Sequence, residues 1–373
     1  MPSRRGATTV LSSRACGRAT LDRQLLLRRA SMGVPAAIER LAGMQAQAPL
    51  PPYTGLWSRL VGFRPDQLAE LLVDRSVVRI ALMRGTVHLV TARDCLAFRP
   101  VLQAMLARTV ATAYRRHLDG LDLDAIVAAA RSLVEARPRT SAELGEFLLA
   151  RWPGRDRLAL TNVARNGLPL VQLPPRAVWG RSGRTVLTTA SNWLGRDLAV
   201  ETAPDELVLR YLAAFGPASV ADAQKWSGLT RLAEVFDRLR PGLLTFLGED
   251  GTELFDLPDA PRPDPDTAAP VRFLPEFDNI LLAHADPSRI MPAEHRAGLF
   301  TVNGIIRAAL LVDGRTAGSW KIGKQGGAAV LTVEPFRRLS IRHRSAIESE
   351  GARLLAFAAA DAARHEVRIL PFE

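Results

Sequence analysis

The sequence predicts an α+β fold with three tandem winged-helix modules, followed by a small antiparallel β-barrel-like domain and a C-terminal helix. The 373 residues are 47% hydrophobic, which is enough apolar material for several domains rather than one. Helices followed by a β-hairpin recur three times, and a proline-rich stretch separates them from a region of short strands. No run of about 18 uncharged apolar residues is present, so we expect a soluble protein without a membrane-spanning helix.

The first winged helix is expected over residues 20–120, after a flexible N-terminus at 1–19. Apolar residues recur with helical spacing at 21–30, 34–42 and 65–73. The segment VVRIALMRGTVHLV then predicts a β-hairpin that turns at Arg84-Gly85. The second winged helix is expected over residues 121–200. Its helices are predicted at 124–136, at 141–149 and after Thr161, and its strands lie near Leu170 and Val186.

The third winged helix, residues 201–257, has the clearest pattern. Its first helix begins at Asp205, two further helices flank the turn at Gly228, and an alternating segment turns at Asp250-Gly251 as a hairpin. A proline-rich linker is expected over residues 258–270. The β-barrel-like domain with its C-terminal helix then covers residues 271–373. Its expected features are turns at Asn303-Gly304 and Asp313-Gly314, a helix over 340–363 and a final strand that closes the sheet.

The positive charge of the chain is concentrated in its first half. Residues 1–120 contain 18 basic and 7 acidic residues, and residues 121–200 contain 11 and 7, whereas residues 201–257 contain 5 and 10. This asymmetry favours contact between the first half and a polyanion such as nucleic acid, although a solvated arginine-rich surface would have the same composition. The presence of only two cysteines and the lack of a secretory signal indicate a reducing, cytoplasmic compartment.

Most catalytic signatures are absent, including the P-loop, the GxGxxG turn, HExxH, CxxC and GxSxG. No histidine pair has metal-ligand spacing, so no metal and no cofactor is implied. Glu276 and Asp278 could form a carboxylate pair or anchor a loop. Gln45 and Gln47 precede a group of prolines that ends the preceding helix. Their amides either satisfy backbone groups of a loop or, in an extended segment, hold one water molecule between them.

Four segments carry a resemblance to a known family: MQAQAPLPPYTGLWSRL, VVRIALMRGTVHLV, RFLPEFDNILLAHAD and ALLVDGRTAGSW. Together they resemble the bacterial winged-helix DNA glycosylases of the AlkZ-like, azinomycin-resistance type. The resemblance covers essentially the whole chain and implies a catalytic Gln-x-Gln motif at Gln45 and Gln47. It implies a monofunctional glycosylase that excises N7-alkylated guanine. Some members of this family also unhook interstrand cross-links, so the resemblance further implies cross-link unhooking and self-resistance to a DNA-alkylating natural product.

The chemistry implied by this resemblance needs few catalytic groups. A positively charged N7-alkylguanine leaves as a neutral base, so the two glutamines would position water and stabilise the oxocarbenium-like sugar. The implied partner is double-stranded DNA carrying alkylated purines, bound by a cytoplasmic, nucleoid-associated monomer without a protein partner. Arg59, Arg79 and Arg84 are candidates for phosphate contacts, and so is Arg307 beside the turn at 303–304.

Two other classes of protein remain open from the sequence. A non-enzymatic winged-helix DNA-binding protein or transcription regulator would also contain these modules, but the third module is acidic, which disfavours DNA reading through its helix at 229–239. A protein-interaction scaffold would explain the repeated modules but not the Gln-x-Gln segment.

Overall fold

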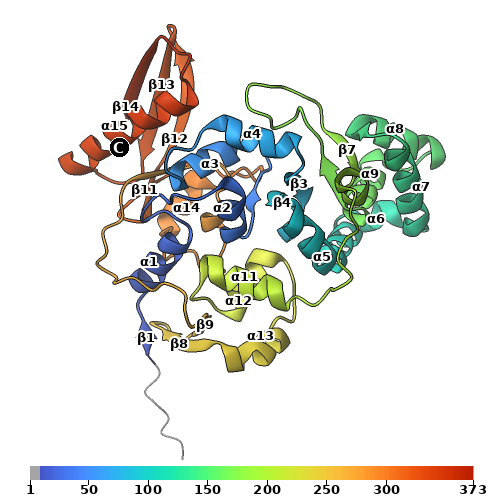
Figure 1. Cartoon of the computed structure of the whole chain (residues 1–373), viewed down its shortest axis with the longest axis horizontal. Helices are drawn as coiled ribbons and strands as arrows, with labels where there is room; N and C mark the ends of the chain where they lie inside the picture. The colour runs from blue at the N-terminus through green and yellow to red at the C-terminus, as the bar shows by residue number, and fades with distance from the viewer. Residues whose placement is uncertain (1–8, 373) are drawn as a thin grey trace, which may run out of the picture.

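The computed structural model describes residues 9–372 and contains three open β-sheets with helices packed around them (Figure 1). Their strand orders are β1-β8-β9, β2-β4-β3-β6-β7-β5 and β10-β11-β12-β13-β14. The N-terminal helix and strand pack against the third module and the C-terminal domain. In residues 9–372, no helix has the length and apolar character needed to cross a membrane.

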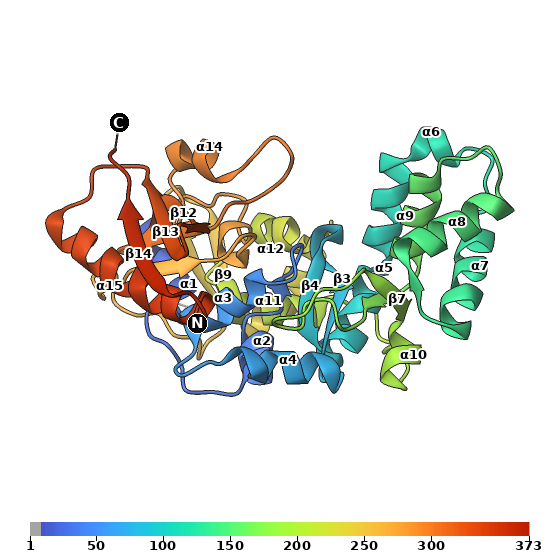
Figure 2. The same cartoon turned by 90° about the horizontal axis from the view of Figure 1, so that it is seen from above.

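The first two modules share the six-stranded sheet. The elements of the first module are α2 (Val34–Arg40), β2 (Met44–Gln45), α3 (Pro51–Arg59), α4 (Pro65–Val73), β3 (Val77–Ala81), β4 (Val87–Thr91) and α5 (Ala92–Ala113). Those of the second are α6 (Arg115–Leu118), α7 (Leu123–Ala136), β5 (Arg139–Thr140), α8 (Ser141–Arg151), α9 (Arg157–Gly167), β6 (Leu170–Gln172), β7 (Val186–Thr189) and α10 (Ala190–Leu194). Because β6 pairs with β3, the first hairpin is continuous with the second module, whose helices α6 to α9 form a lobe at one end of the molecule (Figure 2).

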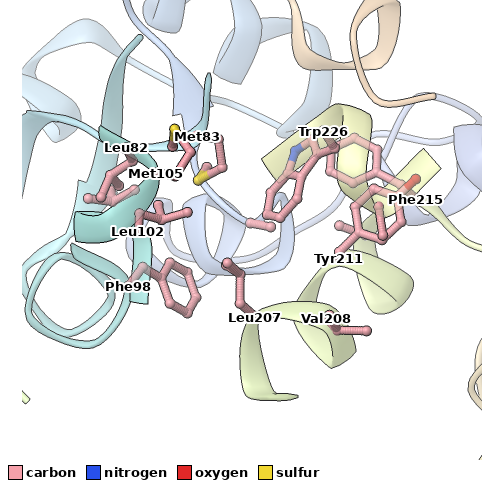
Figure 3. Close-up of a cluster of buried hydrophobic side chains, with 14 of the residues drawn as sticks. Leu82, Met83, Phe98, Leu102, Met105, Leu207, Val208, Tyr211, Phe215 and Trp226 are labelled. Carbon is pink, nitrogen blue, oxygen red and sulfur yellow. The ribbon is translucent and has the colours of Figure 1, made fainter. Parts of the chain in front are cut away.

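The third module packs its helices against the first hairpin. Its elements are α11 (Asp205–Phe215), α12 (Val220–Ser227), α13 (Ala233–Leu239), β8 (Leu244–Gly248) and β9 (Glu253–Asp256). Ser219 caps α12 with a reciprocal capping box to Asp222, which explains why the helix begins there. Figure 3 shows side chains of the first hairpin and α5, including Met83 and Met105, facing Tyr211 and Trp226 of the third module. One hydrophobic core therefore joins the two modules.

The N-terminal segment is ordered in the part that the structure describes. We expected residues 1–19 to be flexible, but Val10–Leu11 forms β1, which pairs in parallel with β8, and Ser13–Arg23 forms α1. The rest of the expected flexible segment, residues 1–8, lies outside the described residues. The proline-rich linker lies along α1, because Arg14 and Arg18 donate through Nε to the carbonyls of Pro265 (2.8 Å) and Thr267 (2.7 Å). The linker is therefore fixed by arginines of α1.

The C-terminal sheet is open, so the expected antiparallel barrel is wrong. Its elements are β10 (Arg272–Leu274), α14 (Arg296–Leu299), β11 (Ala309–Val312), β12 (Arg315–Gln325), β13 (Ala328–Pro335), α15 (Ile341–Ala358) and β14 (Arg364–Ile369). The chain crosses one face of the sheet as α15 after β13, so β14 returns parallel to β13. Strands β10 and β14 are therefore the two edges of the sheet and do not pair with each other.

Candidate active site

The Gln-x-Gln segment lies at an edge of the six-stranded sheet, between a strand and a helix. In β2, Gln45 is the register partner of His88 in β4, and the Ala46 N–H donates to the Val87 carbonyl at 2.7 Å. The turn into β2 requires Gly43, because its φ is +84° and a Cβ there would lie 2.8 Å from a methyl group of Val90. Helix α3 then begins at the prolines that follow, as is usual for proline in a first helical turn.

Gln45 is buried, and two distant parts of the chain hold it, one through its side chain and the other through its backbone. Its Oε1 accepts a hydrogen bond from Arg84 Nη2 at 2.7 Å. Its backbone N–H donates to Oδ1 of Asn279 at 2.9 Å, and Nδ2 of Asn279 donates to the carbonyl of Gly43 at 2.7 Å. Asn279 belongs to the C-terminal domain, so the first residue of the motif is fixed by the first hairpin on one side and by that domain on the other.

The Gln47 side chain is exposed and is held by the neighbouring strand. Its Oε1 accepts from the backbone N–H of Val87 at 2.8 Å. The side-chain carbonyl thus replaces a main-chain acceptor at the end of the β2–β4 ladder. Each glutamine carbonyl has a second lone pair, so both amides could still accept a hydrogen bond from water.

Arg84 lies beside Gln45. It has a left-handed backbone conformation, with φ of 57°, and its two terminal nitrogens donate to Gln45 Oε1 and to the carbonyl of Trp226. Arg84 as a whole residue is partly exposed, but burial around its guanidinium group lowers its pKa to about 10. No ion pair within residues 9–372 includes Arg84.

Arg59 and Arg79 are the other two arginines of the first module that we expected to contact DNA phosphates, and each is only 1% exposed. Arg79 donates to the carbonyl of Ala46 at 2.6 Å and to Gln172 Oε1 at 2.7 Å, and burial lowers its pKa to about 10. Arg59 donates two hydrogen bonds, of 2.9 and 2.8 Å, to the carboxylate of Asp278. In this structure both guanidinium groups hold the protein interior together rather than face a ligand.

Arg307 lies in a different region from the three arginines of the first module. It is exposed next to the turn at 301–305, and its backbone N–H donates to the carbonyl of Leu299 at 2.9 Å. None of the hydrogen bonds found within residues 9–372 joins it to either glutamine. The structure therefore gathers Arg59, Arg79 and Arg84 around the Gln-x-Gln segment, whereas Arg307 is exposed and makes no hydrogen bond to that segment.

His88 and Asn279 contact the motif but were not candidates from the sequence. Burial lowers the pKa of His88 to about 3, with a further contribution from the charge of Arg84, so its imidazole is neutral at physiological pH. Asn279 follows Asp278 in the LPEFDN segment, which could have indicated it. Glu276 is exposed while Asp278 is buried against Arg59, so these carboxylates act as separate groups and Asp278 anchors the loop.

The space beside Gln45 is small. A cavity of about 10 Å³ is bordered by Met44, Gln45, Arg59, Asp278 and Asn279, among others. That volume corresponds to about one water molecule. The residues that the structure describes contain no group of three or more His, Cys, Asp or Glu side chains placed to hold a metal ion.

Comparison with known proteins gives one consistent set of relatives. The interstrand DNA cross-link repair glycosylase of Streptomyces sahachiroi is 25% identical over an alignment of 373 residues, which covers 89% of this chain and 92% of that protein. The solved structure of the Streptomyces sahachiroi DNA glycosylase AlkZ matches with a TM-score of 0.79 at 22% identity, covering 97% of this chain and 100% of the other, which shows the same fold. The family model of AlkZ-like DNA glycosylases matches residues 38–357. The chain therefore belongs to the AlkZ-like DNA glycosylase family and is a DNA N-glycosylase that acts in DNA repair, rather than the non-enzymatic regulator or scaffold that the sequence left open.

Proposed function

We propose that this enzyme is a monofunctional glycosylase that excises N7-alkylated guanine from double-stranded DNA, with Gln45 and Gln47 as its catalytic residues. One observation carries the proposal. The two amides belong to one short segment, and a fixed N–H donor of the first hairpin holds each side-chain carbonyl, at 2.7 Å for Gln45 and 2.8 Å for Gln47. Amides held in this way are preorganised, so they need little rearrangement when a substrate arrives.

The proposed reaction suits neutral amides. Alkylation at N7 gives guanine a positive charge, so the base departs as a neutral molecule and needs no proton from the enzyme. The enzyme has to place water and stabilise the positive charge that develops on the sugar. The free lone pairs of the glutamine carbonyls can do both, because they accept a hydrogen bond from water and present the negative end of a dipole. The neutral imidazole of His88 adds no positive charge at this position.

We also propose that interstrand cross-links are substrates. A base tied to both strands cannot be rotated into a deep pocket. The cavity beside Gln45, at about 10 Å³, is far smaller than a purine, and Gln47 is exposed. Both observations support attack at an open surface. The similarity to an interstrand cross-link repair glycosylase supports the same substrate. A role in self-resistance to a DNA-alkylating natural product is part of this proposal and would follow from activity on such cross-links.

The remaining parts of the proposal concern assembly and DNA contacts. We propose that the three modules are winged helices and that the enzyme acts as a cytoplasmic monomer on nucleoid DNA. The core shared by the first and third modules supports a monomer, because the modules bury each other's apolar faces (Figure 3). Arg307, being exposed, is the proposed phosphate contact among the four arginines selected from the sequence.

The test is a single-turnover incubation with a duplex that contains one N7-methylguanine, followed by alkaline cleavage of abasic sites. We expect the wild type to excise the base and Gln45→Ala/Gln47→Ala to lose about 100-fold or more in rate, since removing one preorganised polar group typically costs that much. Gln325→Ala is the matched control, because Gln325 is an exposed glutamine on β12.

The duplex dissociation constant of each variant is measured alongside the rate. Equal binding with lost excision by the double variant supports the proposal. Excision by the double variant at the wild-type rate rejects these residues as catalytic. A wild-type enzyme that binds the duplex but leaves both N7-methylguanine and a bulky N7 adduct in place rejects the proposed substrate. A duplex with a defined N7–N7 cross-link, tested in the same way, decides whether unhooking occurs.

A further inference from the structure

Arg84 connects the Gln-x-Gln segment to the third module. One of its terminal nitrogens donates to Gln45 Oε1 at 2.7 Å, and the other donates to the carbonyl of Trp226. That carbonyl belongs to the last turn of α12 and is one of the groups that a helix leaves without an internal partner. The partial negative charge at a helix C-terminus attracts a cation, so α12 stabilises the guanidinium group in place of a carboxylate.

The backbone of Arg84 is strained for a non-glycine residue. Its φ of 57° and that of the following Gly85, 72°, place two successive residues of the hairpin turn in the left-handed region. Turns of this kind favour Gly, Asn or Asp, and another residue there costs on the order of 1 kcal/mol or more. An arginine therefore stands at this position despite a conformational penalty, which indicates that its side chain is needed.

The third module also contributes to the contact between Arg84 and α12, through a glycine at the end of that helix. Helix α12 ends at Gly228, which has φ of +81°. A Cβ at Gly228 would lie 3.3 Å from both the backbone nitrogen and the Cα of Arg84, which is tighter than ordinary van der Waals contact. A glycine at this helix end thus allows the first hairpin to approach closely enough for Arg84 to reach the Trp226 carbonyl.

We propose that Arg84 is a positioning residue that fixes the orientation of the Gln45 amide and ties it to α12, and that it does not contact a DNA phosphate. Both terminal nitrogens already have protein acceptors, and the guanidinium is enclosed between the hairpin and α12. Its effect on excision passes entirely through Gln45. This inference rests on the proposed function, because it assumes that the Gln45 amide takes part in excision.

A double-mutant cycle in single-turnover excision of N7-methylguanine tests this role. We expect Arg84→Met to lower the excision rate about 10- to 100-fold while the dissociation constant of the duplex and its salt dependence stay unchanged. In a Gln45→Ala background the same substitution should change the rate by less than about 2-fold, because the amide that Arg84 positions has been removed. Arg84→Lys should be intermediate, since one ammonium group cannot replace the two-pronged guanidinium.

Two control variants separate this role from loss of a charge or from misfolding. Arg368→Met removes an exposed arginine of β14 and should leave excision unchanged. Gly228→Ala pushes α12 away from Arg84 without altering Gln45 or any charge, and it should slow excision only when Gln45 is present. Its matched control is Gly195→Ala, since Gly195 also ends a helix in the left-handed region, at φ +62°, but has nothing within 4 Å of the added Cβ. These two variants keep the test valid if Arg84→Met does not fold.

The outcomes distinguish failure of the inference alone from failure of the proposed function. If Arg84→Met weakens duplex binding and lowers the salt slope by about one, Arg84 is a phosphate contact and the inference is wrong while the glycosylase assignment stands. If Arg84→Met lowers the excision rate by the same factor in the presence and in the absence of Gln45, the inference is also wrong. If Gln45→Ala and Gln47→Ala both excise at the wild-type rate, the proposed catalytic residues fail, and the inference fails with them.

Discussion

The hairpins of the first and third modules have the same outline but differ in how they use their charged residues. Each has two short strands, β3–β4 and β8–β9, joined by a turn that contains a left-handed glycine. In the first hairpin, Arg79 and Arg84 have largely buried guanidinium groups that donate to carbonyl oxygens. In the third, Glu253 of β9 is exposed and accepts two hydrogen bonds from Arg240, which lies in the turn just before β8, while the carboxylate of Asp256 is buried.

This difference shows that a concentration of arginines in a sequence does not by itself locate a phosphate-binding surface. Residues 1–120 carry most of the excess positive charge, yet several of their arginines lie in the protein interior. The buried arginines described between residues 9 and 120 are Arg18, Arg23, Arg59, Arg79 and Arg99. A buried cation is costly unless polar groups surround it, so each of these marks a place where distant segments must be held together.

The largest expected effect comes from breaking the buried ion pair of the third hairpin. Asp256 and Arg23 are both 0% exposed and share hydrogen bonds of 2.7 and 2.8 Å. We expect Asp256→Ala to lower the free energy of unfolding by about 3 to 5 kcal/mol, because Arg23 would remain buried without its counter-charge. Denaturant unfolding measures the loss. A change below about 1 kcal/mol, the value expected for the exposed control Glu253→Ala, would contradict this view of the pair.

A smaller effect is expected in the first hairpin, where His88 should make the free energy of unfolding depend on pH. The pKa of His88 is about 3 in the folded protein, below the value of about 6.5 in an unfolded chain. The unfolded state therefore binds a proton first as the pH falls, so the stability due to neutral His88 is complete above pH 6.5 and is lost towards pH 3.

Between about pH 6 and pH 5, this linkage should lower the free energy of unfolding by up to about 1.4 kcal/mol per pH unit relative to His88→Gln. The measurement is the pH dependence of denaturant unfolding for both proteins. The exposed residue His117 provides the control His117→Gln, which should follow the wild-type curve. Identical slopes for wild type and His88→Gln would show that His88 is not the source of acid sensitivity.

The smallest effect is expected on the outer face of the third hairpin. Arg240 and Glu253 are 43% and 46% exposed, so water and salt screen their attraction. A double-mutant cycle with Arg240→Ala and Glu253→Ala should give a coupling free energy below about 1 kcal/mol that shrinks further in 1 M NaCl. A salt-independent coupling of about 2 kcal/mol or more would remove the contrast between the two hairpins.

Local patterns in the sequence located much of the secondary structure. The alternating segment with Arg84-Gly85 corresponds to β3 and β4, and the helix expected from Asp205 corresponds to α11. The sequence does not predict helix α3, because the prolines at its start indicate only the end of the preceding helix. The sequence predicts that the final strand closes an antiparallel barrel, whereas β14 lies parallel to β13 at the edge of an open sheet. The direction of β14 depends on where α15 packs rather than on its own residues.

The candidate site shows the same limit. The Gln-x-Gln motif is contiguous, so the sequence displays it directly. The residues that contact the motif and its neighbours lie far away along the chain. Arg59 binds Asp278, which is 219 residues away, and the backbone of Gln45 binds Asn279, which is 234 residues away. A single sequence shows that these residues are polar but contains no signal that pairs them. It therefore predicts surface arginines at positions where the structure has buried ones.

The arginines of α1 have a consequence for how the protein is made. Helix α1 leaves the ribosome well before its ion-pair partners. The Asp256 carboxylate that binds Arg23 is synthesised 233 residues later, and the Asp313 carboxylate that binds Arg18 comes 295 residues later. Until then Arg18 and Arg23 lack the carboxylates that offset the cost of burying them. We therefore expect the docking of α1 to be among the last folding steps during translation. Nascent chains that stop before Asp256 should therefore expose the Arg23 side of α1 to proteases and chaperones, even when the second module is already folded.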